Sequence, residues 1–413
     1  STPKMSSGSL SASVTPLLWM GGGSESSGIN WGQGAGYNAK CPLDSRSLND
    51  NRVAVGCVAT AMGQIMRYYS SPTQGRGYHS YTDPNYGIQS ADFGSTTYHW
   101  SSMPYRLSDS SSSSEIDAVA TISYHAGVAV DMQYGISLSG GSGAFSDDVP
   151  DALMDYFGFL YSYIAYRDDY SAEDWNSALQ NELNEGRPIY YGGGDEGSGH
   201  AFVLDGYHLS GYYHFNWGWN GVANGYFSLN SLTPDERIDF TQDQEAVFIM
   251  PHFSERKLEI VELYVATFGR ASDAAGVEYW ADSLLTINQI AESFYYQPET
   301  QEKYPPGTTY EEFVDTVYLN LFNRLPDPAG RDYWVAALSS GKIKASLFIL
   351  ALINGAQDTD AVILANKTSV GEYYAFNELN DAALATLVMS DIDETEQSVE
   401  DAFEIIDDAV GSN

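Results

Sequence analysis

A block of 22 residues occurs twice in the last third of the chain, and this repeat limits the possible folds more than any other feature. Residues 263–284 (LYVATFGRASDAAGVEYWADSL) match residues 317–338 (VYLNLFNRLPDPAGRDYWVAAL) at a constant offset of 54. The same residue types recur at Tyr264/Tyr318, Phe268/Phe322, Arg270/Arg324, Asp273/Asp327, Gly276/Gly330, Tyr279/Tyr333 and Trp280/Trp334. A duplicated unit of this length buries its apolar face against its neighbour. The repeat therefore predicts an all-α C-terminal domain.

The character of the sequence changes at Pro251, just before the repeats. From about residue 31 to 250, helix-like runs come first and strand-like runs with glycine turns come later, which indicates an α+β fold. The helical runs are 57–69, 115–127, 147–158 and 171–186, and the strand-like runs are PIYYGG, AFVLDGYHL, YYHFNWGW, GYFSLN and EAVFIMP. We expect two domains, 1–253 and 254–413, and a flexible surface stretch at 21–28 (GGGSESSG).

The net charge is strongly negative. The 413 residues include 55 acidic and 19 basic side chains, which gives a formal net charge of −36. Such a field disfavours binding to nucleic acid or to anionic membrane surfaces. The most apolar windows, 200–206 and 345–353, are far shorter than the roughly 18 residues that a membrane span needs. We therefore expect no nucleic-acid partner and no membrane span, and the composition suits a secreted, extracellular protein.

The stretch GCVATAMGQIMRYY (56–69) contains Cys57, and the function of the protein depends on the role of this cysteine. Helical spacing places an apolar stripe along this stretch, which predicts a buried helix that ends before Pro72. Cys57 then lies in the first turn, where free N–H groups and the helix dipole lower the pKa of a thiol. The same position also suits a small buried side chain, or a disulfide with Cys41, the other cysteine.

A thiol nucleophile needs a base, and the base needs a group that orients it. Among seven histidines, His200 is the best candidate because it follows the loop GGGDEGSG and begins an apolar strand. Asp205 lies an odd number of residues along that strand, so alternation points it to the opposite face. Asn216 and Trp217 in the next strand are the alternative orienting residues, although hairpin pairing alone does not place Asn216 beside His200. The histidines form no cluster with metal-ligand spacing, so we expect no metal site and no cofactor.

Several motifs follow one another in a fixed order between about residue 13 and 250. They are NWGQGAGYNAKCP, GCVATAMGQIMRYYSSP, GHAFVLDGY and HFNWGWNGVANGYFSLNSL. Together they resemble the streptopain family of papain-fold cysteine endopeptidases. The resemblance implies a papain-like fold with a helical part and an antiparallel sheet part. It maps the nucleophile to Cys57, its partner to His200 and an oxyanion donor to Gln33, with Asn216 and Trp217 flanking the histidine.

The resemblance also implies a function. It points to a secreted bacterial cysteine endopeptidase that acts on proteins or peptides and prefers a hydrophobic residue two places before the cut. Family members are made as zymogens with an N-terminal inhibitory segment, which we do not expect within this sequence. Two alternatives stay open: an acyl transferase or amidase that uses the same Cys–His pair, and a non-catalytic binding or adhesion protein on a papain-like scaffold.

The repeats resemble an uncharacterised domain found in large secreted bacterial proteins. We expect the Tyr-Trp pairs at 279–280 and 333–334 to form the packed core of each unit, with Asp273 and Asp327 as helix N-caps. The alternative is that the repeats dock the protein on an extracellular surface or polymer. The charge of −36 then favours a neutral or cationic target.

Overall fold

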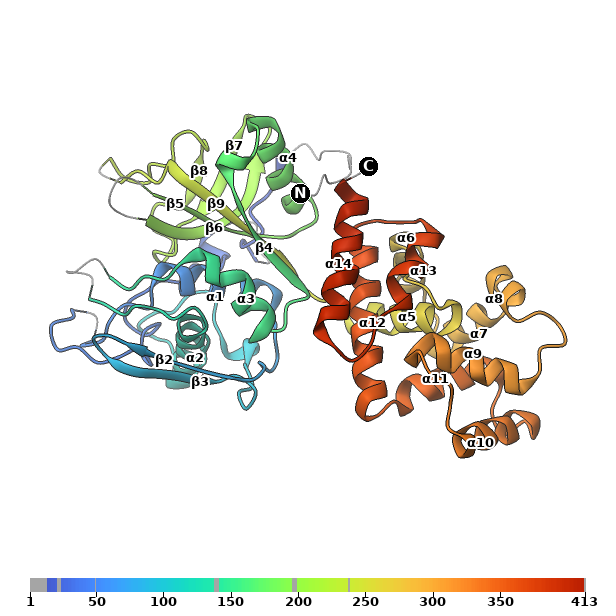
Figure 1. Ribbon diagram of the computed structural model, residues 1–413. Helices are drawn as coiled ribbons and strands as arrows, with labels where there is room; N and C mark the ends of the chain where they lie inside the picture. Colours follow the sequence, from blue (N-terminus) through green and yellow to red (C-terminus); the bar gives the residue numbers. More distant parts are fainter. Residues whose placement is uncertain are drawn as a thin grey trace. The chain divides into compact units, whose positions relative to one another are not determined.

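The computed structural model describes residues 13–20, 24–48, 50–136, 141–194, 199–236 and 238–411. The chain divides into two compact units that meet between Pro251 and His252 (Figure 1). The first unit combines helices and strands, and the described part of the second contains helices only. The predicted fold class, α+β followed by an all-α region, is therefore confirmed.

The first unit begins with a helical part. Its elements are η1 (Glu25–Ser27), α1 (Cys57–Tyr69), β2 (Tyr78–Asp83), β3 (Gly87–Asp92), η2 (Trp100–Ser102), α2 (Ser113–Ala129), η4 (Ser146–Asp148) and α3 (Val149–Asp155). Helix α2 begins earlier than its apolar pattern predicts because Ser112 and Glu115 form a capping box, in which each side chain accepts from the other's backbone N–H. The β2–β3 hairpin has no counterpart among the predicted strands.

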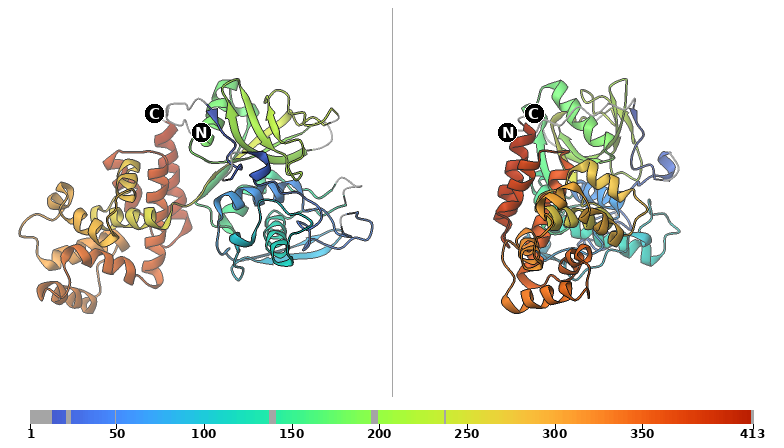
Figure 2. Two further views of the ribbon diagram at one scale, coloured as in Figure 1. Left: turned by 180° about the vertical axis from the view of Figure 1, so that it is seen from behind. Right: turned by 90° about the vertical axis from the view of Figure 1, so that its right-hand side faces the viewer.

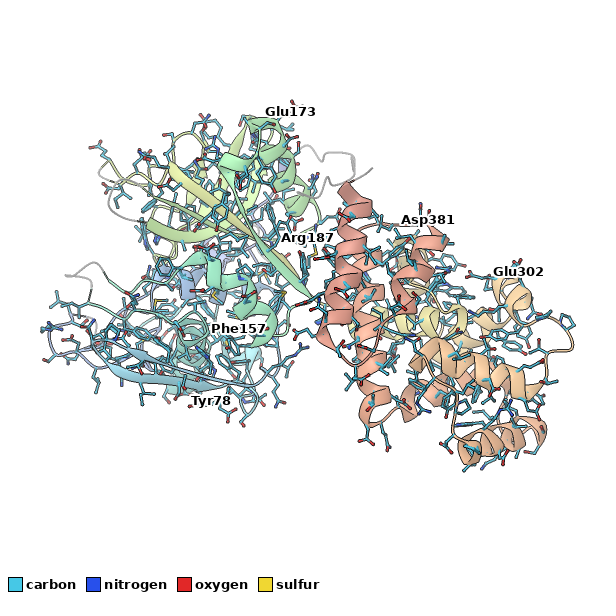
Figure 3. All side chains as sticks on the ribbon, in the orientation of Figure 1. Tyr78, Phe157, Glu173, Arg187, Glu302 and Asp381 are labelled. Carbon is cyan, nitrogen blue, oxygen red and sulfur yellow. The ribbon has the colours of Figure 1, made fainter. Side chains whose placement is uncertain are left out.

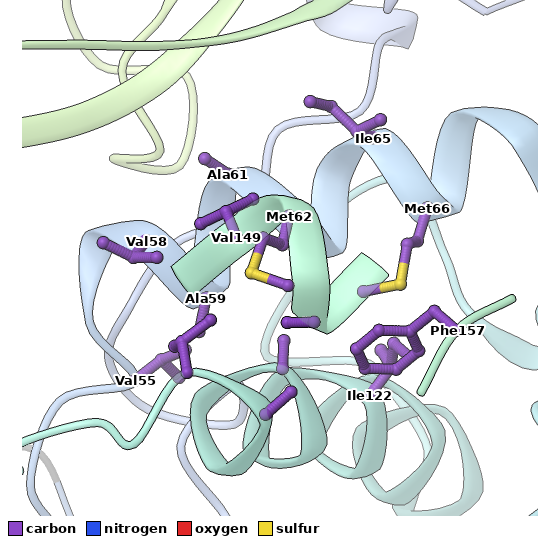
Figure 4. Packing of buried hydrophobic residues seen from close by; sticks show 14 of the residues in the cluster. Val55, Val58, Ala59, Ala61, Met62, Ile65, Met66, Ile122, Val149 and Phe157 are labelled. Atoms are coloured by element: carbon purple, nitrogen blue, oxygen red, sulfur yellow. The ribbon is translucent and has the colours of Figure 1, made fainter. Parts of the chain in front are cut away.

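Helix α1 lies at the centre of this part. Its residues Met62 and Met66 are fully buried and pack with Ile122 of α2, Val149 of α3 and Phe157 (Figure 4). These positions repeat at helical spacing along the stripe predicted from the sequence. The helix ends at Ser70, whose backbone is left-handed, with φ of 52°. The apolar stripe thus anchors α1 in the core and fixes the position of its first residue, Cys57.

An antiparallel sheet forms the rest of the first unit. The strands are β1 (Ser13–Val14), β4 (Tyr161–Tyr166), β5 (Ile189–Gly194), β6 (Gly199–His208), β7 (Tyr212–Asn216), β8 (Gly225–Phe227) and β9 (Gln242–Met250), with η5 (Arg167–Asp169) and α4 (Ala172–Asn184) after β4. Their order is β4-β9-β5-β6-β7-β8, and β1 pairs with β6. The strand predicted at GYFSLN is shorter in the structure, because only its first three residues form β8.

The two faces of the sheet bury different side chains, as alternation along each strand requires. Tyr190 and Val203 belong to the same apolar cluster as α1. Tyr191 and Phe202 belong to a second cluster with Trp175 of α4. Helix α1 therefore covers one face and α4 the other, as the front and rear views show (Figures 1 and 2).

The second unit is built from ten helices in its described part. They are α5 (Glu255–Phe268), α6 (Ala274–Ala281), α7 (Ile287–Tyr295), α8 (Pro298–Lys303), α9 (Tyr310–Phe322), α10 (Pro328–Ser339), α11 (Ala345–Gly355), α12 (Asp358–Phe376), α13 (Ala382–Ser390) and α14 (Glu396–Gly411). Asp381, labelled in Figure 3, caps α13 by accepting from the N–H groups of Ala383 and Leu384. Among the described helices none alone has the length and apolarity of a membrane span; α11 and α12 do so only as a pair bent by 106°.

The repeat appears in the structure as two equivalent sets of three helices, α5–α7 and α9–α11. Asp273 and Asp327 accept from the N–H of Gly276 and Gly330 at 2.8 and 2.9 Å, so both are N-caps as predicted. Trp280 and Trp334 are half-buried, and each packs 5.2 Å from a core phenylalanine. The neighbouring tyrosines are 69 % and 55 % exposed. The prediction that both members of each Tyr-Trp pair form the core is therefore wrong for the tyrosines.

Candidate active site

Cys57 is the first residue of α1, and the backbone before it is held in a conformation that favours glycine. Gly56 has φ of 97°, and a Cβ at this position would lie 2.7 Å from the sulfur of Met132. Its carbonyl accepts from both the N–H and the hydroxyl of Thr60. The main chain therefore turns sharply into the helix and presents the Cys57 side chain at the helix N-terminus.

The thiol of Cys57 lies beside the start of strand β6. Burial raises its pKa, while hydrogen bonds from the backbone N–H groups of Ala201, Val58 and Cys57 itself oppose that rise. The sequence predicted a lowered pKa from the helix terminus alone, and burial reverses this direction. The contact with Ala201 also places the sulfur next to the residue that follows His200 in the chain. The fold thus brings the thiol of Cys57 beside the first residues of β6, the strand on which His200 lies.

His200 is packed among aromatic rings. Its ring centroid lies 4.9 Å from that of Trp219, 5.0 Å from Phe240 and 5.7 Å from Phe202. Burial lowers the pKa of His200 to about 4, although the hydrogen bond to Trp217 opposes this shift. The imidazole is therefore neutral at neutral pH.

The tautomer of His200 follows from its hydrogen bond. Its Nε2 lies 2.8 Å from the main-chain carbonyl oxygen of Trp217. A carbonyl can only accept, so Nε2 carries the proton and Nδ1 keeps a free lone pair. A neutral imidazole with this tautomer can take a proton from a thiol through Nδ1. Cys57 and His200 together thus have the chemical properties of a nucleophile and its base.

Of the two predicted orienting residues, Asn216 and Trp217, it is Trp217 that bonds His200, and it does so through its main-chain carbonyl rather than its side chain. The side-chain amide of Asn216 donates to the carbonyl of Ile29 at 2.7 Å, and its oxygen accepts from the N–H of Gly218. Asn216 therefore holds the polypeptide around the site instead of binding the imidazole. A register shift between β6 and β7 near Leu204 explains why simple hairpin pairing did not place these residues correctly.

Asp205 is bonded elsewhere. Its carboxylate lies 2.6 Å from Nδ1 of His214 and also accepts from the N–H of Leu18 at 3.0 Å. The alternation argument, which pointed Asp205 away from His200, agrees with these contacts.

Gln33 lies in a segment that is tied to α1. Its main-chain carbonyl accepts from the N–H of Val55 at 3.0 Å, two residues before Cys57. The N–H of Trp31 donates to Oε1 of Gln64, a buried residue of α1, at 3.0 Å. These bonds hold the half-buried Gln33 beside residues 53–56, the segment that leads into α1. They place the main chain of Gln33 near α1, and the role of its side-chain amide as an oxyanion donor stays a prediction.

Cys41 does not pair with Cys57, and both cysteines are free. Cys41 is buried, and burial raises its pKa to about 12, with a smaller opposing effect of Arg52. The disulfide interpretation is therefore wrong, and Cys41 behaves as a packed, unreactive thiol. Within the described residues no group of three or more His, Cys, Asp or Glu side chains is placed to bind a metal ion.

Three contacts of His200 carried little signal in the sequence. Trp219 lies in the motif NWGWNG but was not distinguished from its neighbours, and Phe240 stands alone in a polar stretch. The third contact, the Trp217 carbonyl, belongs to the backbone that every residue shares. Such contacts depend on how loops close over the strand, which no local pattern encodes.

Residues 31–227 match the model of the peptidase C10 family. The structure of active wild-type interpain A, a cysteine protease of Prevotella intermedia, aligns over 58 % of this chain and 95 % of its own. The sequence identity in that alignment is 39 % and the TM-score is 0.53. The chain belongs to the peptidase C10 family. This result confirms the resemblance to streptopain and the papain-like arrangement of the first unit.

Two further members of the peptidase C10 group give the extent of the similarity. Thiol protease/hemagglutinin PrtT of Porphyromonas gingivalis is 41 % identical over 230 residues, which make up 54 % of this chain and 26 % of PrtT. Streptopain of Streptococcus pyogenes is 36 % identical over 224 residues, 51 % of this chain and 56 % of streptopain. The chain thus covers about half of streptopain and about a quarter of PrtT. Residues 291–358 match a domain of unknown function (DUF4214).

Proposed function

We propose that this protein is a cysteine endopeptidase in which Cys57 is the nucleophile and His200 its base. The observation that carries the proposal is the joint placement of the two residues. The Cys57 thiol receives a hydrogen bond from the N–H of Ala201, and the adjacent imidazole is fixed through Nε2 with Nδ1 free. Membership of the C10 family, whose named relatives include thiol and cysteine proteases, supports the same chemistry.

The first half of the reaction forms a thioester. As Nδ1 of His200 takes the thiol proton, the sulfur attacks the peptide carbonyl carbon, and the carbonyl oxygen becomes negatively charged. The Cys57 N–H has no backbone carbonyl partner within the helix because it belongs to the first turn. This N–H and the side-chain amide of Gln33 are the proposed oxyanion donors. When the carbon–nitrogen bond breaks, His200 returns its proton to the leaving amine.

The second half releases the acid. Water attacks the thioester carbonyl while Nδ1 of His200 accepts a proton from it, and the carbon–sulfur bond breaks. The proton then returns to the sulfur, which restores the neutral pair. A neutral starting pair agrees with the raised pKa of Cys57 and the lowered pKa of His200, because burial disfavours charge on both groups.

The decisive experiment combines a mixed peptide library with Cys57→Ala and a matched Cys41→Ala variant. We expect wild type and Cys41→Ala to release new amino and carboxyl termini, and Cys57→Ala to release none. Iodoacetamide should label Cys57 before Cys41 and abolish cleavage. Full activity in Cys57→Ala, or faster labelling of Cys41, would refute the assignment. Products that carry an added acyl acceptor instead of a free carboxylate would favour an acyl transferase.

The finer expectations are part of the proposal. The cleavage sites in the same library test the preference for a hydrophobic residue two places before the cut. Secretion into the extracellular medium and synthesis as a zymogen are proposed by analogy with the relatives, one of which has been described as prointerpain A. For the second unit we propose an extracellular surface or polymer as the target. Exposed tyrosines at the equivalent positions 279 and 333 support it.

A further inference from the structure

The carbonyl that orients His200 belongs to a loop that needs support. Residues 217–224 connect β7 to β8, and four of them have positive φ: Gly218 at 70°, Asn220 at 57°, Gly221 at 79° and Ala223 at 63°. Asparagine and alanine adopt this left-handed conformation at an energetic cost. Hydrogen bonds within the loop, and bonds that hold the loop from outside, therefore decide where the Trp217 carbonyl lies.

Both N–H groups of Trp217 are held by the far end of the same loop. Its backbone N–H donates to the side-chain oxygen of Asn224 at 3.0 Å, and its indole N–H donates to the carbonyl of Ala223 at 3.0 Å. The carbonyl of Trp217 is left free to accept from His200. Asn224 thus holds Trp217 in place, and the carbonyl of Trp217 holds the imidazole of His200.

Asn224 is held in turn by the N-terminal segment. Its side-chain amide donates to Oε1 of Glu25 at 2.6 Å and to the side-chain oxygen of Asn30 at 2.9 Å. Glu25 lies within GGGSESSG, the stretch that the sequence predicted to be flexible. Residues 21–23 of this stretch lie outside the described part of the chain. The described remainder forms a short 3-10 helix that places the Glu25 carboxylate against the loop.

Glu25 is the partly exposed member of a charge cluster whose other members, His214 and Asp205, are buried. Its Oε2 accepts from the indole N–H of Trp19 at 2.9 Å and lies 3.4 Å from Nε2 of His214, whose Nδ1 is 2.6 Å from Asp205. Burial lowers the pKa of His214, but the charges and hydrogen bonds of Asp205 and Glu25 outweigh it and raise the pKa to about 9. Burial raises the pKa of Glu25, and its hydrogen bonds with His214, Asn224 and Trp19 lower it overall. The carboxylate is therefore ionised at neutral pH and accepts from donors only.

We propose that Glu25 and Asn224 are positioning residues of the active site. Through the path Glu25–Asn224–Trp217–His200 they set the direction of the Nε2 hydrogen bond and thereby aim Nδ1 at the thiol of Cys57. The expected effect on catalysis rests on the proposed function. The expected effect on His200 does not, because the reactivity of the Cys57 thiol can be measured without a substrate. It assigns a role to a segment that the family motifs do not include.

The chemistry of the cluster makes specific substitutions informative. Among the described residues, the side chains that contact the Glu25 carboxylate all present N–H groups: Trp19, Asn224 and protonated His214. Glu25→Gln keeps the shape but turns an NH₂ group toward one of these donors, so at least one bond is lost. Asn224→Asp keeps the acceptor for the Trp217 N–H but sets two carboxylates against each other. In the double variant Glu25→Gln/Asn224→Asp, the new amide can donate to the new carboxylate, which restores this bond with reversed polarity, while the bond from residue 224 to Asn30 stays lost.

Two measurements on the full chain test the inference, with Ser26→Ala as the matched control. Ser26 is exposed on the same turn as Glu25 and bonds only to Ser24 among the contacts described. For Glu25→Gln and Asn224→Asp we expect kcat on a peptide substrate to fall about ten-fold, with KM within about two-fold, because only the alignment of the base changes. Relative to Asn224→Asp, the double variant should recover part of the loss, because the bond between residues 25 and 224 returns and the bond to Asn30 does not. Ser26→Ala should match wild type.

The second measurement reads the thiol without a substrate. The rate of Cys57 alkylation by iodoacetamide, located by peptide mass mapping, is compared at pH 7 in the native protein and in the protein unfolded in urea. In the native protein a correctly aimed imidazole assists the thiol, whereas in the unfolded protein the thiol reacts without it. We expect each single variant to slow the reaction of the native protein by about ten-fold and to leave the rate of the unfolded protein unchanged.

The outcomes separate this inference from the proposed function. Unchanged kcat and unchanged alkylation in both single variants would overturn the positioning role. The positioning role would also be overturned if thermal unfolding and active-site titration showed that the losses come only from a smaller folded fraction. Absence of any recovery in the double variant would overturn it as well. If wild type cleaves no peptide but the alkylation pattern holds, the positioning role stands and the peptidase assignment fails.

Discussion

If His200 is the base of the proposed mechanism, this half-buried residue sets the lower pH limit of activity. Its pKa is lowered to about 4 mainly by burial, and Trp219 stacks on its ring at 4.9 Å. The base must be unprotonated at Nδ1, so activity should persist at pH 5 and fall as the pH drops through about 4.

Trp219→Ala tests this account. Removing the indole exposes the imidazole, so the pKa of His200 should rise toward its ordinary value of about 6.5. The acidic limb of kcat/KM should then move to higher pH, and activity at pH 5 should fall relative to activity at pH 8. A pH–rate profile of both proteins measures the shift. An unmoved acidic limb would show that a group other than His200 controls it.

Gln33 gives a second prediction at the scale of one residue. If its side-chain amide stabilises the oxyanion, Gln33→Ala should lower kcat by about ten- to a thousand-fold with little change in KM, because the donor acts only in the transition state. Steady-state kinetics with Gln133→Ala, an exposed glutamine, as the control measures the effect. A change confined to KM would assign Gln33 to substrate binding instead.

At the scale of helices, the two repeats offer a matched pair of caps. Asp273 and Asp327 accept from the N–H of Gly276 and Gly330. Asp273 also lies 3.8 Å from Arg270, and the charge of Asp327 acts on the equivalent Arg324 without an ion pair that short among the described contacts. Loss of an N-cap costs about 1 kcal/mol. Asp273→Ala and Asp327→Ala should each reduce the free energy of unfolding of the second unit by about this amount, with the larger loss at Asp273. Urea unfolding followed by circular dichroism measures it, and no loss in either variant would contradict the capping role.

The same elements show what a sequence can and cannot reveal. The caps were predictable because capping depends on a residue type at a fixed spacing from the helix start. The exposure of Tyr279 and Tyr333 was less predictable. Consecutive residues on a helix point about 100° apart, which lets one of them face solvent, but Tyr373 and Tyr374 of α12 are consecutive and both buried. The Trp217 carbonyl and the support from Glu25 were not predictable, because both depend on loops that close over distant strands.

At the scale of the whole molecule, the boundary between the units decides where the chain can be cut. The structure places it between Pro251 and His252, and the carboxylate of Glu372 binds both Nδ1 of His252, at 2.7 Å, and the N–H of Phe253. A chain that ends at Phe253, the predicted boundary, leaves both residues without these partners and exposes an apolar ring. A chain that ends at Pro251 keeps all of strand β9, which ends at Met250.

The two truncations therefore test whether the first unit is an independent enzyme and what the second contributes. We expect the chain ending at Pro251 to fold, by circular dichroism, and to cleave small peptides at close to the full-length rate, because the proposed site lies entirely within the first unit. The chain ending at Phe253 should be no more soluble.

On an insoluble protein substrate of neutral or positive charge, both truncated forms should lose binding and turnover, since the net charge of −36 disfavours polyanionic targets. Tyr279→Ser/Tyr333→Ser in the full chain should reproduce that loss and spare small-peptide cleavage. Equal activity of every form on all macromolecular substrates would remove the targeting role, and failure of the Pro251 form to fold would make the helical unit part of the enzyme core.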